Sequence, residues 1–115
     1  MKSSEYLKLE IYIPETCLAE LESALFRVDA GHIGNYDRCL SYSPVMSTWR
    51  SLPGTNPYSG AIGELSREQE LKVEVTICRK NLEAVMDAVR QVHPYEEPVV
   101  NVIPLFCTMR DYTAQ

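Results

Sequence analysis

Histidine and clustered basic residues are scarce in this sequence. Two histidines occur among 115 residues, and acidic residues outnumber basic ones, so the formal net charge is −5. The largest basic cluster is the pair Arg79-Lys80. Because affinity for nucleic acids depends on many lysine and arginine contacts with phosphates, we expect no nucleic-acid partner.

Long apolar runs are also missing. The opening segment, MKSSEYLKLEIYIPE, contains no continuous apolar stretch of the kind found in secretory signals. No part of the chain approaches the ~20 consecutive apolar residues that a membrane-spanning helix requires. We therefore predict neither a secretory signal nor an association with membranes.

The cysteines do not form a recognisable pair. Cys17, Cys39, Cys78 and Cys107 are scattered, with no Cys-x-x-Cys spacing. This pattern offers neither a zinc knuckle nor a redox pair, and it is typical of small buried thiols in a reducing compartment. We expect a cytoplasmic protein, and the length predicts a single domain over residues 1–115.

One segment occurs twice in the chain. The residues LKLEIYIPETCLAELESALFRV, starting at Leu7, align without a gap with LKVEVTICRKNLEAVMDAVRQV, starting at Leu71. Identities include Leu7/Leu71, Lys8/Lys72, Glu10/Glu74, Ile13/Ile77, Leu18/Leu82, Ala24/Ala88 and Val28/Val92. We interpret this as an internal duplication, with copies at about 5–48 and 63–106.

Each copy starts with a strand pattern and continues with a helix pattern. Apolar residues first alternate with polar ones, at Leu7, Leu9, Ile11 and Ile13 and at Leu71, Val73, Val75 and Ile77. They then recur at helical spacing, at Leu18, Leu21, Leu25 and Val28 and at Leu82, Val85, Val89 and Val92. A period of two predicts a half-buried strand, and the later spacing predicts an amphipathic helix that covers it.

The order of elements predicts the fold class. Further extended segments at 39–48 and 98–106 complete a strand, helix, strand, strand, helix, strand order. This is the α+β, ferredoxin-like βαββαβ sandwich, with the two duplicated strands central in an antiparallel sheet and two helices on one face. Lys8, Glu10, Lys72 and Glu74 should then lie on the uncovered face, paired across strands and either solvated or part of an interface.

The remaining segments are predicted to be irregular. A loop at about 49–62, within RSLPGTNPYSGAIGE, should turn at Pro53-Gly54 and at Asn56-Pro57. A loop this long in a small domain is usually functional or contacts a neighbouring subunit. The tail at 107–115 shows no periodicity and is expected to be loose.

Two polar motifs follow the predicted helices. In VHPYEEP, Pro94 disfavours helical backbone at His93, so the second helix should end at Val92 or His93. Pro98 suits the start of a strand. In DAGHIGNYD, Gly31 suits a left-handed position after a helix, and Gly34-Asn35 suits a tight turn. Backbone geometry alone can therefore explain both motifs.

The side chains of these motifs are nevertheless the candidate ligand-binding residues: His32, Asn35, Tyr36, His93, Tyr95, Glu96 and Glu97. Imidazole and carboxylate are ordinary ligands of zinc or copper, so His93 and Glu96 are the candidate metal ligands. A complete site would need more, from His32, Cys39 or another subunit. We predict no enzyme, because neither a Gly-x-Ser-x-Gly motif nor a phosphate-binding glycine loop is present.

Several of these motifs resemble a known family. GHIGNYDRCLSYSPVMSTWRSLPGTNPYSGAIGEL and VHPYEEPVVNVIPL are similar to the small inserted domain of the Nif-three-like (YqfO-type) family, over about residues 5–106. The motifs are Gly-x-Ile-Gly-Asn-Tyr-x-x-Cys, an aromatic-Arg pair, Gly-x-Asn-Pro-Tyr and His-Pro-Tyr-Glu-Glu-Pro. The resemblance implies a standalone version of a CutA- and PII-like domain, which assembles as a trimer.

The chain also departs from that family. Full-length members hold two metals through His, Asp and Glu ligands in flanking domains, and two histidines cannot reproduce such a site. The usual Phe-Arg-Pro is Trp49-Arg50-Ser51 here. The resemblance therefore implies a PII- or CutA-like oligomeric binding or regulatory module without the family's hydrolase activity. The alternatives are a structural or protein-interaction domain without a ligand, and a copper- or zinc-binding CutA-like protein.

Overall fold

The computed structural model describes residues 4–113. The elements are β1 (Tyr6–Ile13), α1 (Leu18–Arg27), β2 (Ser41–Arg50), β3 (Leu65–Cys78), α2 (Leu82–Val92), β4 (Val100–Pro104) and α3 (Met109–Thr113). The 3-10 turns η1 (Glu15–Cys17) and η2 (Arg79–Asn81) lead into α1 and α2. Within residues 4–113, no helix has the length and apolar character needed to cross a membrane.

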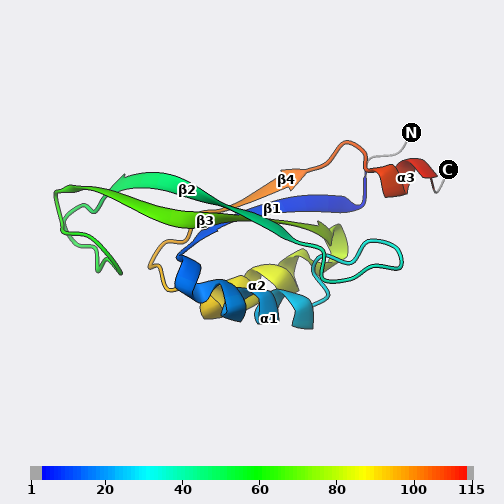
Figure 1. Cartoon of the computed structure of the whole chain (residues 1–115), viewed down its shortest axis with the longest axis horizontal. Coiled ribbons are helices and arrows are strands. Elements are labelled where there is room, and N and C mark those ends of the chain that lie inside the picture. Colours follow the sequence, from blue (N-terminus) through cyan, green and yellow to red (C-terminus); the bar gives the residue numbers. More distant parts are fainter. Residues whose placement is uncertain (1–3, 114–115) are drawn as a thin grey trace.

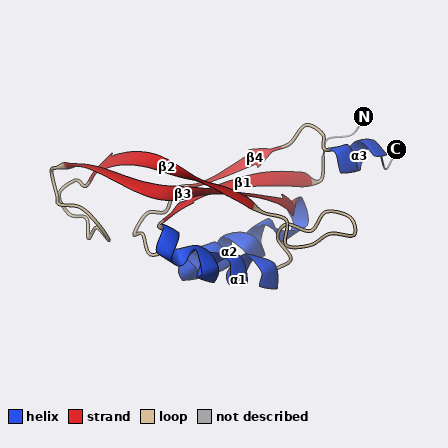
Figure 2. Ribbon diagram, in the orientation of Figure 1, coloured by secondary structure: helices blue, strands red, loops and turns tan. Residues whose placement is uncertain are grey.

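The strands form one antiparallel sheet in the order β2-β3-β1-β4, so β3 and β1 are central. The helices α1 and α2 pack side by side on one face of this sheet (Figure 1), and the other face is left open (Figure 2). The βαββαβ architecture predicted from the duplication is therefore confirmed.

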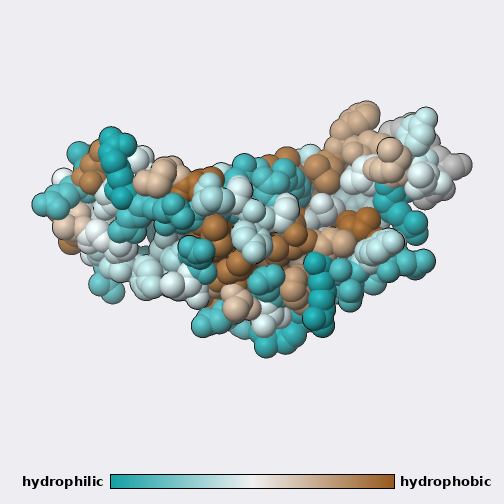
Figure 3. Space-filling model, in the orientation of Figure 1, coloured by the Kyte–Doolittle hydropathy of each residue, from teal (hydrophilic) through white to brown (hydrophobic). Residues whose placement is uncertain are grey.

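The core lies between the sheet and the two helices. The apolar residues of β1 and of the second half of β3 are buried, as are the central residues of both helical stripes, Leu21, Leu25, Val85 and Val89. On the side of the molecule shown in Figure 3, hydrophobic residues gather where the helices meet the sheet, and hydrophilic residues cover the outer surface of the helices. The alternation and the helical spacing thus predicted which side chains form the core.

The open face of the sheet carries the four predicted charges as a network. Lys8 Nζ lies 3.1 Å from Glu74 Oε2, and Lys72 Nζ lies 3.3 Å from Glu10 Oε2 and 3.4 Å from Glu74 Oε1. Hydrogen bonding from Lys8 lowers the pKa of Glu74, and hydrogen bonding to Glu10 raises the pKa of Lys72. Pairing across strands is confirmed, and its effect on stability is small because the groups are solvated.

Both junctions after the helices adopt the predicted backbone. The helix α2 ends at Val92, and His93 is extended, with φ −75° and ψ 126°. Gly31 has φ +84° after α1, and Ile33 and Tyr36 exchange backbone hydrogen bonds of 2.7 and 3.0 Å around the Gly34-Asn35 turn. The final strand begins at Val100, two residues later than the strand start expected at Pro98.

The strand β2 ends two residues later than predicted, and β3 begins six residues before the predicted alternation at Leu71. Their register continues to Arg50↔Leu65, beyond the end of β1, and forms a two-stranded arm from Val45–Arg50 and Leu65–Glu70. The arm projects past the helices (Figure 1). Trp49 and Arg50, predicted to lie in the loop, are therefore strand residues, and the connection covers residues 51–64.

The tail contains a helix, which corrects the expectation that it is loose. Thr108 and Asp111 cap α3 reciprocally: the Asp111 N–H donates to Thr108 Oγ1 at 3.1 Å, and the Thr108 N–H donates to Asp111 Oδ2 at 2.9 Å. This capping box satisfies amide groups that a short helix would leave unpaired. Ser4 also donates to Asp111 Oδ2 at 2.5 Å. The last two residues of the tail lie outside the described residues.

Candidate functional site

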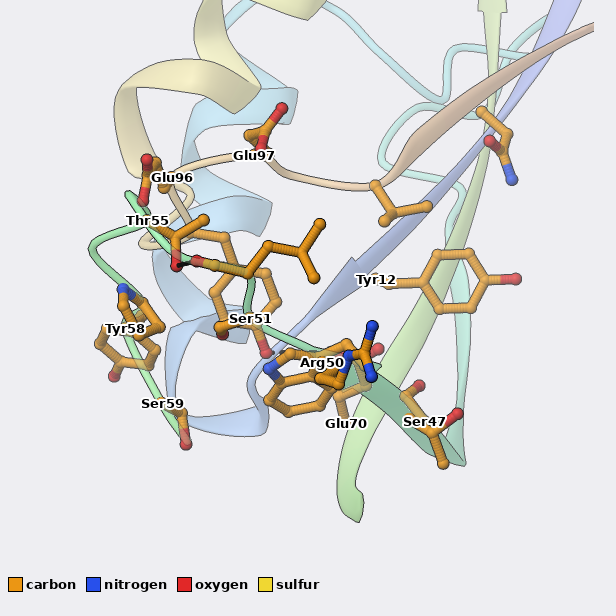
Figure 4. Close-up of a pocket in the computed structure, with 17 residues that line it drawn as sticks. Tyr12, Ser47, Arg50, Ser51, Thr55, Tyr58, Ser59, Glu70, Glu96 and Glu97 are labelled. Carbon is orange, nitrogen blue, oxygen red and sulfur yellow. Dashed lines mark hydrogen bonds between the residues drawn. The ribbon is translucent and has the colours of Figure 1, made fainter. Parts of the chain in front are cut away.

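A cleft of about 590 Å³ opens between the arm, the 51–64 connection and the turn that follows α2. We call residues 51–64 the flap. The cleft is lined by Tyr12, Ser47, Thr48, Trp49, Arg50, Ser51, Leu52, Thr55, Pro57, Tyr58, Ser59, Glu70, Tyr95, Glu96, Glu97, Val99 and Asn101. Figure 4 shows Tyr58 and Ser59 of the flap on the opposite side of this opening from Tyr12 of β1. Segments far apart in the sequence thus build one concave surface.

The flap has a defined structure of its own. Its first residues form the predicted turn at Pro53-Gly54, in which Gly54 has φ +96° and the Thr55 N–H donates to the Leu52 carbonyl at 3.3 Å. Proline followed by a glycine with positive φ is the signature of a type II turn. The second predicted turn, at Asn56-Pro57, does not form. This part of the flap instead bonds to the turn after α2.

Three contacts hold the flap in place. The Asn56 N–H donates to Glu96 Oε2 at 2.7 Å, and the rings of Tyr58 and Tyr95 lie 5.7 Å apart. Ser59 Oγ donates to Glu68 of the arm at 2.6 Å. These contacts explain why Asn56 does not turn: its amide is engaged with a carboxylate forty residues later in the chain.

His93 contacts Tyr95, a residue of the cleft wall, but does not itself line the cleft. The residue is 7% exposed, and its Nε2 lies 2.6 Å from the Tyr12 carbonyl. The Tyr95 N–H donates to Nδ1 at 3.3 Å, which assigns the Nε2–H tautomer. Desolvation lowers the pKa of His93, so the neutral ring is favoured. The buried histidine thus connects β1 to the turn that carries Tyr95.

The metal role predicted for His93 and Glu96 competes with these hydrogen bonds. Glu96 holds the flap, and both nitrogens of His93 have intrachain partners. Among residues 4–113, no three His, Cys, Asp or Glu side chains gather closely enough to hold a metal ion. A metal at His93 and Glu96 stays a prediction, and it requires the imidazole to release one of its two partners.

Tyr95 and Glu70 form a partly buried polar contact in the cleft. The Tyr95 hydroxyl donates to Glu70 Oε2 at 3.0 Å, and Glu70 is 6% exposed. Desolvation, together with this hydrogen bond, raises the pKa of Tyr95 far above its ordinary value. The phenol therefore remains a hydrogen-bond donor throughout the physiological pH range.

The other predicted cluster lies elsewhere. The helices run in opposite directions, so His32, Asn35 and Tyr36, which follow α1, lie at the far end of the helical layer from the turn after α2 (Figure 1). The His32 ring nitrogens lie 2.9 Å from Asp29 and from the Gly34 carbonyl, and the bond to Asp29 raises the pKa of His32. Within one chain, the structure brings Tyr95, Glu96 and Glu97 together but not His32, Asn35 and Tyr36.

Sequence reasoning missed several cleft residues. Tyr12 gave no signal because it occupies a polar position in a strand pattern, and Glu70 gave none because it precedes the alternation that starts at Leu71. Trp49, Arg50 and Tyr58 did have one, since they belong to the aromatic-Arg and Gly-x-Asn-Pro-Tyr motifs of the family resemblance. Those motifs and His-Pro-Tyr-Glu-Glu-Pro converge on the same cleft.

No protein-family model matches the chain. A GTP cyclohydrolase 1 type 2 homolog of Halalkalibacterium halodurans is 39% identical over 98 residues, which are 85% of this chain and 26% of that protein. The counterpart in Bacillus subtilis is 33% identical over 98 residues, with the same coverage. The chain thus spans about a quarter of the length of the curated relatives it matches.

The chain is also similar to solved structures. A Bacillus cereus protein related to NIF3 superposes with a TM-score of 0.78 at 32% identity, over 91% of this chain and 27% of that chain. CutA of Archaeoglobus fulgidus (TM-score 0.69, 16% identity, 93% and 90% covered) and GlnK of B. subtilis (0.61, 19%, 89% and 86%) share the fold alone. The chain is therefore a partial homologue of the NIF3-like GTP cyclohydrolase 1 type 2 homologs, and its fold is that of CutA and PII-like proteins.

Proposed function

We propose that this chain is a non-enzymatic, PII- and CutA-like oligomeric module that binds a small molecule in the cleft. The cleft itself carries the proposal: it has a volume of about 590 Å³, aromatic walls and a few convergent polar groups. Small-molecule sites usually combine these features and this size. Hydrogen bonds from the flap to both the arm and the turn after α2 support a site formed before the ligand arrives.

A binding role fits the part of the relatives that the chain represents. It aligns with about a quarter of the GTP cyclohydrolase 1 type 2 homologs, so the activity in that name is not assigned to these residues. The buried His93 bonds to a backbone carbonyl and is not paired with a nucleophile of the cleft. A regulatory or binding contribution is the simpler proposal for this portion.

We propose a homotrimer, the assembly that the resemblance to CutA and PII proteins implies. The arm supports an interface because it carries large apolar side chains in contact with solvent, among them Met46 at 70% exposure and Leu65 at 58%. The outer edge of β2 also presents unpaired backbone groups, which favour pairing with a second chain. In such an assembly, His32, Asn35 and Tyr36 would approach a cleft only from a neighbouring subunit.

We also propose a cytoplasmic location. The four cysteines are unpaired thiols, and each is only partly exposed. Free thiols persist in reducing compartments. Fractionation of cells that produce the full-length chain would place it there, and recovery from an extracellular fraction with oxidised cysteines would contradict this.

A protein-interaction domain is the second candidate function. The same exposed apolar residues of the arm, together with the charged open face of the sheet, would suit a partner protein equally well. Under this alternative the cleft stays empty, and the flap only stiffens the arm. The third alternative, a copper- or zinc-binding protein, depends on His93 and Glu96.

Native mass spectrometry on protein purified without a chelator tests these candidates. We expect an oligomer that carries extra mass from a small organic molecule. The Tyr58→Ala variant should lose that mass, because it removes a cleft wall. Tyr112→Ala is the matched control, since Tyr112 is 65% exposed on α3 and does not line the cleft. A bare chain that shows no thermal shift with any member of a metabolite library would overturn the binding role, and bound metal would support the third alternative.

A further inference from the structure

The buried Glu70 carboxylate has one oxygen without a hydrogen-bond partner in the described part of the chain. Its Oε2 accepts from Tyr95, but within residues 4–113 no donor contacts Oε1. In the same part of the chain, every fully inaccessible side-chain oxygen or nitrogen has a partner. Since Oε1 has no partner there, it is not fully inaccessible, and Glu70 lines the cleft. The carboxylate is therefore available to a ligand.

The charge of Glu70 has no basic partner in the described part of the chain. None of the ion pairs within residues 4–113 includes Glu70, and Arg50 is the one basic residue among those that line the cleft. Arg50 is itself exposed to solvent. Glu96 and Glu97 add two further carboxylates to the lining. A buried carboxylate without a counter-charge is costly, and a cation placed beside it offsets that cost.

Aromatic rings make up much of the remaining wall. Tyr12, Trp49, Tyr58 and Tyr95 all line the cleft, and the Tyr58 and Tyr95 rings are in contact. The faces of such rings attract organic cations, and the attraction grows when water is excluded. Carboxylate and aromatic walls together favour a cation with an apolar body over a bare metal ion.

We propose that the cleft binds an organic cation, a primary amine or an amidinium or guanidinium compound, whose charged group bonds to Glu70 Oε1 while its body packs against the tyrosine and tryptophan rings. The proposal rests on the binding role proposed above and specifies its ligand class. In this arrangement, Glu70 Oε2 accepts the hydrogen bond from Tyr95, and Oε1 accepts one from the ligand.

Three probes of similar shape and size differ in charge, so they test whether the cleft prefers a cation. Benzamidine is a cation, benzamide is neutral and benzoate is an anion. Isothermal titration of the assembled full-length protein should show benzamidine binding at least tenfold more tightly than benzamide, and no binding of benzoate. Glu70→Gln retains an acceptor for Tyr95 and should remove this preference, while Arg50→Ala should strengthen benzamidine binding. The matched control is Glu83→Gln, which removes one charge from the exposed surface of α2.

Each outcome supports or overturns a specific statement. Binding of benzamide or benzoate to the cleft with no preference for benzamidine would overturn the cation proposal and leave the binding role intact. No binding by any probe, together with an empty native mass, would overturn both. If Glu70→Gln does not fold, Glu97→Gln at the exposed rim should still weaken benzamidine several-fold. An equal loss with Glu83→Gln would show that only net charge matters, and would overturn the proposal.

Discussion

At the scale of single residues, the two histidines have opposite protonation behaviour. His93 is buried beneath the cleft and is favoured in its neutral form, and His32 is exposed beside Asp29 and is favoured in its charged form. The sequence placed both in turns after helices but could not distinguish them. Burial depends on the segment packed over the ring, and for His93 that segment is the end of β1.

This difference predicts how stability depends on pH. Because the folded state lowers the pKa of His93 below 6.5, its contribution is fully present above pH 6.5 and is lost as the pH falls through the folded-state value. His32 has the opposite sign, since its raised pKa adds stability below pH 6.5 that is lost at higher pH. In a His32→Gln background, urea unfolding should show lower stability at pH 5.5 than at pH 7.5.

The control is the same comparison with His93→Gln added, which leaves the chain without histidine. The stability difference between pH 7.5 and 5.5 should then shrink, because no histidine is left to titrate between these values. The carboxylates Glu74 and Asp111, whose pKa values are lowered, titrate below this window and do not contribute. One proton limits the slope to about 1.4 kcal/mol per pH unit. An unchanged slope in the double variant would show that His93 is not responsible.

At the scale of elements, periodicity predicted the strands and helices that face the core and missed those that do not. Residues 65–70 of β3 are polar on both faces apart from Leu65, so they carry no apolar alternation although they are strand. The α3 helix was missed for a different reason. Its signal is the capping pair Thr108 and Asp111, and a search for hydrophobic spacing does not detect it.

Prediction of the cleft residues from the sequence was limited in the same way. Tyr95, Glu96 and Glu97 could be chosen because they cluster in a short motif, but Glu70 joins them only through the tertiary fold. Its position in the arm depends on how β2 and β3 continue beyond β1, and the sequence did not reveal this continuation. A residue whose role arises from long-range packing leaves no local pattern to read.

The flap provides a test at this scale. Glu96→Ala removes the acceptor of the Asn56 N–H, so the flap should open more often. We expect amide exchange at Asn56 to accelerate roughly tenfold, as the loss of one hydrogen bond to a charged group implies. Hydrogen exchange followed by mass spectrometry should show the effect in residues 51–64, with exchange in β1 unchanged.

Glu97→Ala is the matched control for the flap. Glu97 also lines the cleft, is exposed and carries the same charge, but within residues 4–113 it accepts no hydrogen bond from the flap. Its removal should leave exchange in residues 51–64 unaltered. Equal acceleration by both variants would indicate that charge near the cleft, and not the bond to Asn56, holds the flap.

At the scale of the whole molecule, the arm makes the shape elongated. The principal extents are 53 × 26 × 24 Å, and the long axis includes a two-stranded arm without helices beneath it. An isolated two-stranded hairpin is only marginally stable in water. The flap supports one side of this arm, while Met46 and Leu65 remain exposed. A neighbouring chain would complete its packing.

This shape predicts that the proposed assembly depends on the arm. The double change Met46→Asp and Leu65→Asp places charges on exposed apolar positions, so it should yield monomers without disturbing the core between sheet and helices. Light scattering would measure the mass and circular dichroism the folded structure. Ala84→Asp, on the exposed surface of α2, is the control and should assemble normally. A double variant that keeps the assembled mass would contradict this role of the arm.

The capped helix α3 has a consequence for how this fold can be used in evolution. Because Ser4 bonds directly to Asp111, the described polypeptide enters and leaves the domain at nearly the same point. A unit with adjoining ends can be spliced into a surface loop of a host protein while the host's own backbone path stays continuous. The geometry that closes this small domain on itself thus also makes it portable, suited equally to a separate chain or to a cassette within a longer one.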